Sequence, residues 1–261
     1  MNDERFSDKV ALVTGAGSGI GEATARMLVR EAATVYAADI DFDAAQRVAT
    51  QCSERGKILP LLLDVSAERS WEEAVEAILS QHGRINVVVN NAGVSFAMPT
   101  DDMSLERWRS LMAVNLDGVF LGTRHAIQAM KPQGGGSIVN VASVSGITPS
   151  PTAAAYCASK AAVRMFTQAV AIECADGQTG IRINVVTPGG VITPMWEKQE
   201  FFQQLVAEHG SVDRAFAAMA GNSPSQRFHS ADDVARTILY LASGDSSHLT
   251  GTEIVMDRSC N

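Results

Sequence analysis

A strand, a glycine-rich loop and a helix follow one another at the start of the chain. Residues 10–13 are an apolar run typical of a buried strand, Gly15, Gly19 and Gly21 lie in the loop that follows, and residues 22–30 have a helical pattern. Glycines let a backbone approach a pyrophosphate, and the first turn of a helix offers free N–H groups and a positive dipole end. This order predicts an α/β fold whose first unit binds a dinucleotide, with an ordinary glycine-rich turn as the alternative.

The same alternation continues along the chain. Apolar runs predict strands at 34–39, 58–63, 85–90, 137–142, 181–186 and 253–256, and helices are predicted at 67–82, 104–130, 152–174 and 231–243. Apolar strands that alternate with helices are typical of a doubly wound parallel sheet buried on both faces. Since the 261 residues contain no evident linker, we expect one domain, 1–261.

Charge and composition narrow the possible partners. The formal net charge of −8 argues against a nucleic acid or an anionic membrane, and no apolar run is long enough to span a bilayer. The polar start, 1–6, is unlike a signal peptide. Cys52, Cys157, Cys174 and Cys260 form no Cys-x-x-Cys pair, and the histidines lack metal-ligand spacing. We therefore expect a cytoplasmic protein without a metal site, whose partner is a small molecule.

A tyrosine and a lysine mark the candidate chemistry. Tyr156 and Lys160 are four residues apart in an alanine-rich helical run, so they share one helix face. A phenol has a reference pKa of about 10, and a nearby positive charge lowers it, which suits proton exchange with an alcohol or ketone. Because this pair is common on solvated helices, it needs support. Ser143, thirteen residues upstream and after the apolar run 137–142, supplies some of it.

Together these motifs resemble the short-chain dehydrogenase/reductase family over nearly the whole chain. The resemblance rests on the glycine loop, on Tyr156 with Lys160, on the run Asn90-Asn91-Ala92-Gly93 and on the turn Pro188-Gly189. It implies a Rossmann-type domain with seven parallel strands in the order 3-2-1-4-5-6-7 and helices on both faces. The site is then expected at the carboxyl ends of the strands.

The resemblance also implies a reaction, reversible hydride transfer between NAD and a secondary alcohol or ketone. Tyr156 is then the general acid/base, Ser143 orients the substrate oxygen, and Lys160 binds the nicotinamide ribose and lowers the pKa of Tyr156. Asn115, a poor interior helix residue, matches a family asparagine that lies in a helix kink and completes a proton relay. The alternative is a polar residue merely tolerated in its helix.

An acidic residue at the end of the second predicted strand bears on the choice of cofactor. Asp39 lies eighteen residues after Gly21, close to the spacing expected for a carboxylate on the adenosine ribose. Such a carboxylate repels a 2′-phosphate and so predicts NAD; Ser18 agrees, because NADP-binding relatives often carry a basic residue there. Alternatively, Asp39 caps the helix that starts near Asp43, although Asp41 is available for that role.

The remaining cofactor contacts are implied by the resemblance alone. Asp64 matches an acid that contacts the adenine amino group, and Thr193 a residue that holds the nicotinamide carboxamide. The full predicted set is Gly15, Ser18, Gly19, Ile20, Gly21, Asp39, Ile40, Asp64, Val65, Asn91, Ala92, Gly93, Tyr156, Lys160, Pro188, Gly189, Val191 and Thr193.

The segments expected near the nicotinamide are apolar or weakly polar. No arginine or lysine follows Gly93 or Ser143 closely, so we see no clamp for a carboxylate or phosphate. Residues 194–226 match the family's substrate lid, or else form a plain helical insertion; Lys198 is a cation within them. The predicted substrate contacts are Phe96, Ser143, Ser145, Met195 and Trp196.

These features suit a bulky, uncharged substrate. The runs 140–146 and 193–195 resemble those of bacterial hydroxysteroid and cyclic-alcohol dehydrogenases, so we expect a steroid or another cyclic secondary alcohol. The alternatives are a broad-range carbonyl reductase, a 3-oxoacyl thioester reductase and a non-catalytic NAD-binding module. The thioester reductases normally use NADPH and a basic surface, which this acidic chain lacks. Sugar epimerases or dehydratases of the extended relatives differ in glycine spacing and length.

Two further expectations concern assembly and the end of the chain. The long helices predicted at 104–130 and 152–174 resemble the interface helices of homotetrameric members of the family, so we expect a homotetramer, with a dimer as the alternative. Relatives often end in Asp-Gly-Gly where this chain reads Asp257-Arg258-Ser259. That difference leaves the C-terminal conformation open.

Overall fold

The computed structural model describes residues 5–51, 56–221 and 226–256, and it is built around one parallel sheet. The seven strands run in the order β3-β2-β1-β4-β5-β6-β7, as predicted. Their bounds are β1 Val10–Thr14, β2 Thr34–Asp39, β3 Lys57–Leu62, β4 Val87–Asn90, β5 Gly136–Val141, β6 Ile181–Pro188 and β7 Glu253–Met256. The order reverses between β1 and β4, which is where such sheets bind their ligands.

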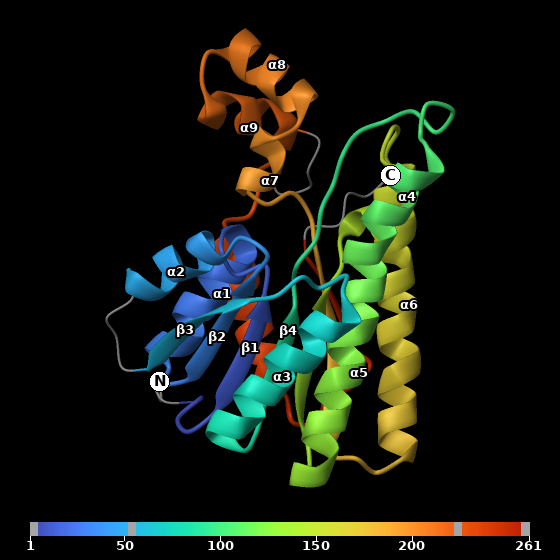
Figure 1. Ribbon diagram of the computed structural model, residues 1–261. Helices are drawn as coiled ribbons and strands as arrows, with labels where there is room; N and C mark the ends of the chain where they lie inside the picture. Colours follow the sequence, from blue (N-terminus) through green and yellow to red (C-terminus); the bar gives the residue numbers. More distant parts are fainter. Residues whose placement is uncertain (1–4, 52–55, 222–225, 257–261) are drawn as a thin grey trace.

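Helices cover both faces of the sheet (Figure 1). They are α1 Gly19–Arg30, α2 Phe42–Thr50, α3 Glu68–His82, α4 Leu105–Met112, α5 Gly118–Met130, α6 Ala154–Asp176, α7 Pro194–Glu197, α8 Glu200–His209, α9 Val212–Ala220 and α10 Ala231–Ala242. One core packs Leu28 of α1 and Ile238 of α10 against the sheet, and a second packs Trp71 of α3 and Met130 of α5. Successive strand residues supply the two cores because their side chains alternate between the faces.

The predicted helix 104–130 is divided in three. A π-helix, Ala113–Asp117, separates α4 from α5, and the buried Asn115 lies in it. Such single π-helical turns within helices are frequent at functional sites. The interruption is the local irregularity that an interior asparagine favours.

The helices α7, α8 and α9 extend beyond the sheet (Figure 1). They follow β6, so they lie past the carboxyl ends of the strands. Their aromatic residues pack on one another: Phe202 contacts Phe216 at a ring-centroid distance of 4.7 Å, and Trp196 lies 5.8 Å from Phe228. Aromatic packing of this kind was expected of a helical insertion, and it leaves the predicted lid role open.

Several residues that the sequence analysis singled out lie outside the described residues. Asp257, Arg258 and Ser259 lie outside them, as do Cys52 and Cys260. Within the described ranges, no helix is both long and apolar enough to cross a membrane. The same ranges contain no cluster of three or more histidine, cysteine or acidic side chains fit to hold a metal ion.

Candidate active site

The loop between β1 and α1 is built so that only glycine fits at key positions. Gly15 and Gly19 have φ of +63° and +56°, a backbone conformation that residues with a side chain rarely adopt. A methyl group on Gly21 would lie 2.2 Å from the carbonyl oxygen of Gly15, and one on Gly19 would lie 3.2 Å from Thr193 Cγ2. The loop is therefore tight, and it lies against the segment that follows β6.

The start of α1 offers an anion site. Ser18 is the exposed N-cap and makes no side-chain capping bond, and the helix begins with the bond from Glu22 N to Ser18 O. The amides of residues 19–21 thus have no partner within the helix, and the positive end of the helix dipole lies beside them. These groups fit a pyrophosphate.

Asp39 is bound to the glycine loop. Its Oδ2 accepts a hydrogen bond from Gly17 N at 2.9 Å, and its Oδ1 accepts one from Asp41 N at 3.0 Å. Asp41 caps α2 by accepting from Ala44 N, so Asp39 is not that cap. The carboxylate therefore lies beside the glycine loop, where an adenosine ribose would be held.

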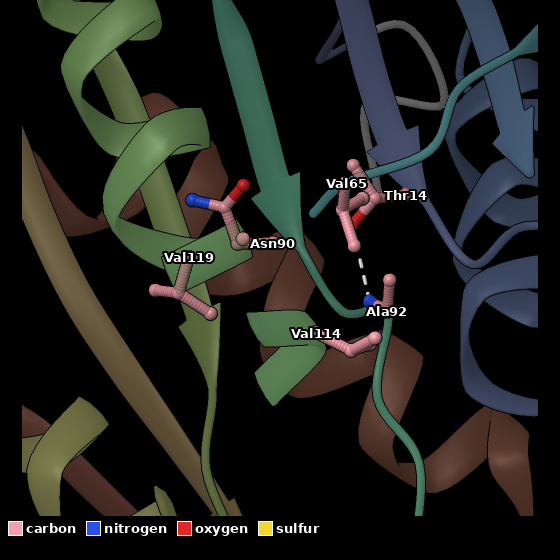
Figure 2. Close-up of a pocket in the computed structure, with 7 residues that line it drawn as sticks. Thr14, Val65, Asn90, Ala92, Val114 and Val119 are labelled. Carbon is pink, nitrogen blue, oxygen red and sulfur yellow. Dashed lines mark hydrogen bonds between the residues drawn. The ribbon is translucent and has the colours of Figure 1, made fainter. Parts of the chain in front are cut away.

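The ends of β1 and β4 are joined by a threonine that the sequence analysis did not single out. Thr14 Oγ1 accepts hydrogen bonds from the backbone amides of Asn91 and Ala92, both at 3.0 Å. Figure 2 shows the bond from Ala92. Asn91 Nδ2 donates in return to Thr14 O at 2.9 Å. The pocket that Thr14, Val65 and Ala92 line with their neighbours is too narrow to admit a water molecule. It lies at the point where the strand order reverses.

Tyr156, Ser143 and Lys160 meet at the carboxyl end of β5. The Ser143 hydroxyl lies beside the Tyr156 phenol, where it favours the ionised form of the phenol. Ser143 Oγ also accepts from Ser145 N at 3.2 Å, which closes the turn after the strand. Lys160 Nζ donates to Val141 O at 2.9 Å and lies 5.7 Å from the centre of the Tyr156 ring. A phenol, a hydroxyl and an ammonium therefore share one small site.

Burial dominates the acid–base properties of this group. It raises the pKa of the Tyr156 phenol, and the neighbouring Ser143 hydroxyl opposes that rise. It also lowers the pKa of the Lys160 ammonium from 10.5 to about 8. The pKa of Tyr156 is thus raised, whereas the resemblance implied a lowered one, because burial is the largest cause of the shift and outweighs the effect of Ser143.

Asn115 is fully buried and uses both ends of its amide. Its Oδ1 accepts from Val94 N at 2.8 Å, and its Nδ2 donates to Val94 O at 2.9 Å and to Ser159 Oγ at 3.2 Å. Ser159 Oγ donates in turn to Tyr156 O at 2.7 Å. A methyl group on Gly93 would lie 3.4 Å from Asn115 Oδ1 and 3.5 Å from Lys160 Nζ, so both side chains border the same glycine.

The other predicted contacts lie around this edge of the sheet. Asp64 Oδ1 binds the amide and hydroxyl of Ser66, and Gly189 N donates to Met256 O. The remaining members, by exposure, are the buried Val65, Val191 and Pro188, the half-buried Ile20, Gly93, Phe96, Ser145 and Trp196, and the exposed Ile40 and Met195. Trp196 Nε1 donates to Val191 O at 2.8 Å, which fastens the start of α7 to the end of β6.

Three residues of the site were missing from the sequence-based set: Thr14, Gly17 and Ser159. Thr14 is a polar residue that ends an apolar strand, and Gly17 is a further glycine of the loop. Ser159 precedes Lys160 and has 0% exposure in its helix. The signal in each case was a small polar residue or glycine within a motif already recognised.

Comparison with known proteins adds independent information. The family model described as short chain dehydrogenase matches residues 9–204. The cyclopentanol dehydrogenase of Comamonas sp. (strain NCIMB 9872) is 39% identical over 97% of this chain and 97% of its own length. The 3-beta-hydroxysteroid dehydrogenase of Comamonas testosteroni is 36% identical over 98% of this chain and 96% of its own length. The NADP-dependent (R)-specific alcohol dehydrogenase of Lentilactobacillus kefiri is 35% identical over 97% of both chains.

Solved structures resemble the chain over nearly its whole length. A short-chain type dehydrogenase/reductase from Mycobacterium marinum superposes with a TM-score of 0.88 at 34% identity, covering 99% of both chains. The 3-ketoacyl-(acyl-carrier-protein) reductase from Brucella melitensis, complexed with NADH, gives a TM-score of 0.85 at 32% identity, covering 97% of this chain and 99% of that one.

Proposed function

This chain belongs to the short-chain dehydrogenase family and is an oxidoreductase of the type that acts on CH–OH groups, and we propose that it oxidises cyclic secondary alcohols with NAD. The observation that carries this proposal is that the Ser143 hydroxyl and the Lys160 ammonium both lie beside the Tyr156 phenol. It gives a substrate oxygen both a proton acceptor and a hydrogen-bond donor in one place.

Each residue of the site has a part in the proposed reaction. The ionised Tyr156 accepts the hydroxyl proton of the alcohol, and it returns that proton when a ketone is reduced. Ser143 Oγ accepts from Ser145 N, so its own hydrogen is free to be donated to the substrate oxygen. The Lys160 ammonium stabilises the phenolate and binds the nicotinamide ribose. Asn115 continues the proton path from Lys160 past Gly93.

The cofactor would be held by the loops that close the strands. The amides of residues 19–21 would bind the pyrophosphate, Asp39 the adenosine ribose, Asp64 the adenine, and Thr193 the nicotinamide carboxamide. When bound, the nicotinamide supplies the acceptor for the hydride. The protein contributes orientation and electrostatic stabilisation.

A preference for NAD over NADP should depend on Asp39. Its carboxylate beside Gly17 would face a 2′-phosphate with like charge, and Ile40 next to it is 68% exposed. We expect the double variant Asp39→Ala, Ile40→Arg to reverse the preference, by more than tenfold in kcat/KM. The relative from Lentilactobacillus kefiri, which is NADP-dependent by name, makes this test necessary. Wild-type protein that binds NADPH more tightly than NADH would contradict the assignment.

The substrate class rests on the side chains around the site and on the relatives. Phe96, Met195 and Trp196 are apolar or aromatic, and no cation lies among the residues that follow Ser143 as far as Gly146. Two relatives act, by name, on cyclopentanol and on a 3-beta-hydroxysteroid. The alternatives are a broad-range carbonyl reductase and a 3-oxoacyl thioester reductase, the second supported by the Brucella structure.

A substrate panel tests this proposal. We expect kcat/KM with NAD to be higher for cyclopentanol or a 3-hydroxysteroid than for a small linear alcohol or a 3-hydroxyacyl thioester. A tenfold advantage for either of the last two, about 1.4 kcal/mol of differential transition-state binding, would contradict the proposed substrate class. NADH binding without turnover of any member would instead favour a non-catalytic module.

A homotetramer is proposed from apolar residues exposed on α5 and α6. Phe120, Met165 and Ile172 are 45%, 67% and 62% exposed. Exposed apolar patches of this kind usually mark interaction sites.

The unpaired thiols of Cys157 and Cys174 suit the proposed location in a reducing cytoplasm.

The double variant Met165→Glu, Ile172→Glu is expected to convert the tetramer into smaller species, because it would bury charges in the interface. Light scattering at micromolar concentration measures this. The matched control is Leu62→Glu, since Leu62 is 59% exposed on the edge strand β3. A wild-type monomer, or an equal effect of the control, would contradict the assignment of the interface.

A further inference from the structure

Arg164 lies one helical turn beyond Lys160 on the same face of α6. Its guanidinium group donates three hydrogen bonds. Nε donates to Glu253 Oε1, NH2 donates to Glu253 Oε2 at 2.8 Å, and NH1 donates to Gly146 O at 2.8 Å. The side chains of Arg164 and Glu253 are 25% and 13% exposed. The planar fork thus holds a carboxylate and a backbone carbonyl at once.

The carbonyl that Arg164 binds belongs to the turn that carries Ser143. Gly146 N donates to Ser143 O at 2.9 Å, which closes this turn. A methyl group on Gly146 would lie 2.7 Å from Ala161 N, so the turn rests directly on the backbone of α6. Arg164 therefore fastens the Ser143 turn to the helix that carries Tyr156 and Lys160.

The carboxylate of Glu253 reaches the other side of the site. Glu253 begins β7, and its Oε1 also accepts from Thr187 Oγ1 at 2.6 Å. Thr187 is buried at the end of β6, directly before the Pro188-Gly189 turn. A chain of contacts thus runs from the Ser143 turn through Arg164 and Glu253 to the Pro188-Gly189 turn, which belongs to the predicted cofactor site.

We propose that Arg164 and Glu253 are positioning residues that fix the spacing between the Ser143 turn and the Pro188-Gly189 turn. This inference rests on the proposed function, because that spacing sets where the alcohol carbon lies relative to the nicotinamide. Misplacement of reacting groups by about 1 Å can cost about 10²-fold in rate. A lysine at position 164 keeps the positive charge but lacks the planar set of N–H donors of the guanidinium group, so it cannot make all these contacts.

The test compares Arg164→Met, Arg164→Lys and Glu253→Gln with wild type. For Arg164→Met we expect kcat with cyclopentanol to fall about 10- to 100-fold, with KM and the Kd for NADH within about threefold of wild type. Amide hydrogen exchange of residues 143–148 should become faster. Arg164→Lys and Glu253→Gln should retain more of the wild-type thermal stability than of the wild-type kcat.

The matched control is Arg5→Met. Arg5 also forms a forked ion pair, with Nε to Glu31 Oε2 at 2.7 Å and NH2 to Glu31 Oε1 at 2.6 Å. Glu31 follows the C-terminal end of α1, whereas the glycine loop precedes its N-terminal end. Arg5→Met should lower stability without changing kcat or exchange in residues 143–148.

An unchanged kcat and unchanged exchange in Arg164→Met would overturn the inference. So would equal losses in Arg5→Met, which would show that general destabilisation is the cause. If Arg164→Met does not fold, Arg164→Lys and Glu253→Gln decide in the same way. If wild type oxidises no alcohol, the proposed function fails, and hydrogen exchange of residues 143–148 still tests the contact independently.

Discussion

Tyr156→Phe is expected to lower kcat for alcohol oxidation by at least about 10²–10⁴-fold, the usual contribution of general acid–base catalysis. The substitution removes only the phenol hydroxyl, which lies beside Ser143. The ring remains beside Lys160, so the fold and NADH binding should be retained. Steady-state kinetics, NADH fluorescence and thermal unfolding measure the three properties.

The matched control is Tyr240→Phe, because Tyr240 lies on α10 and is 37% exposed. It should leave kcat unchanged. A Tyr156→Phe variant with near wild-type turnover would remove Tyr156 from the catalytic role.

The pH dependence of wild-type activity should follow the protonation state of Tyr156. Burial raises the pKa of Tyr156, so the phenol is protonated at neutral pH. Alcohol oxidation needs the ionised form as proton acceptor, and kcat/KM should therefore rise from pH 6 towards pH 9. Ketone reduction needs the protonated form and should not rise over that range. Because Tyr156 and Lys160 are close, the apparent pKa values belong to the pair.

Lys160→Met is expected to abolish most turnover and yet to stabilise the protein. Burial lowers the pKa of Lys160 from 10.5 to about 8, so the folded protein disfavours the charged form that predominates at neutral pH. Removing that charge should raise the free energy of unfolding at pH 7 by about 1–3 kcal/mol. The gain is reduced because Val141 O loses its hydrogen bond from Nζ. Denaturant unfolding measures it.

The stability gain should itself depend on pH. Since the folded-state pKa lies below the unfolded-state value, the wild-type penalty is fully present below pH 8 and disappears as the pH rises to 10.5. The difference between Lys160→Met and wild type should shrink over that interval. Lys131→Met, at an exposed lysine, is the control and should change stability little. A destabilised, fully active Lys160→Met would contradict both parts of this prediction.

The sequence was sufficient for the fold because local patterns decide most of it. Alternating apolar strands and helices predicted the parallel sheet, and the family resemblance supplied the strand order that the structure confirms. The helix predicted over 104–130 was too simple, because the pattern of apolar residues does not reveal the π-helix at Ala113–Asp117. Asn115 was the one visible sign of it.

The site was predictable where a motif names a residue and less so where contacts join distant segments. Tyr156, Ser143 and Lys160 were identified together, and the structure brings them together. The roles of Thr14 and Ser159 depend on backbone partners that a sequence does not show. The contact between Arg164 and Glu253 joins residues 89 positions apart, so only the fold reveals it. The raised pKa of Tyr156 likewise follows from burial.

The most direct test of the central claim uses cyclopentanol deuterated at the carbinol carbon. Incubation with wild-type protein and NAD, followed by mass spectrometry of the reduced cofactor, reports where the hydride goes. We predict that the deuterium appears in the reduced nicotinamide at wild-type turnover rates and that its appearance in Tyr156→Phe is slowed at least about 10²-fold. Cyclopentanone formation without deuterium in the cofactor, or equal rates in the two proteins, would contradict the account.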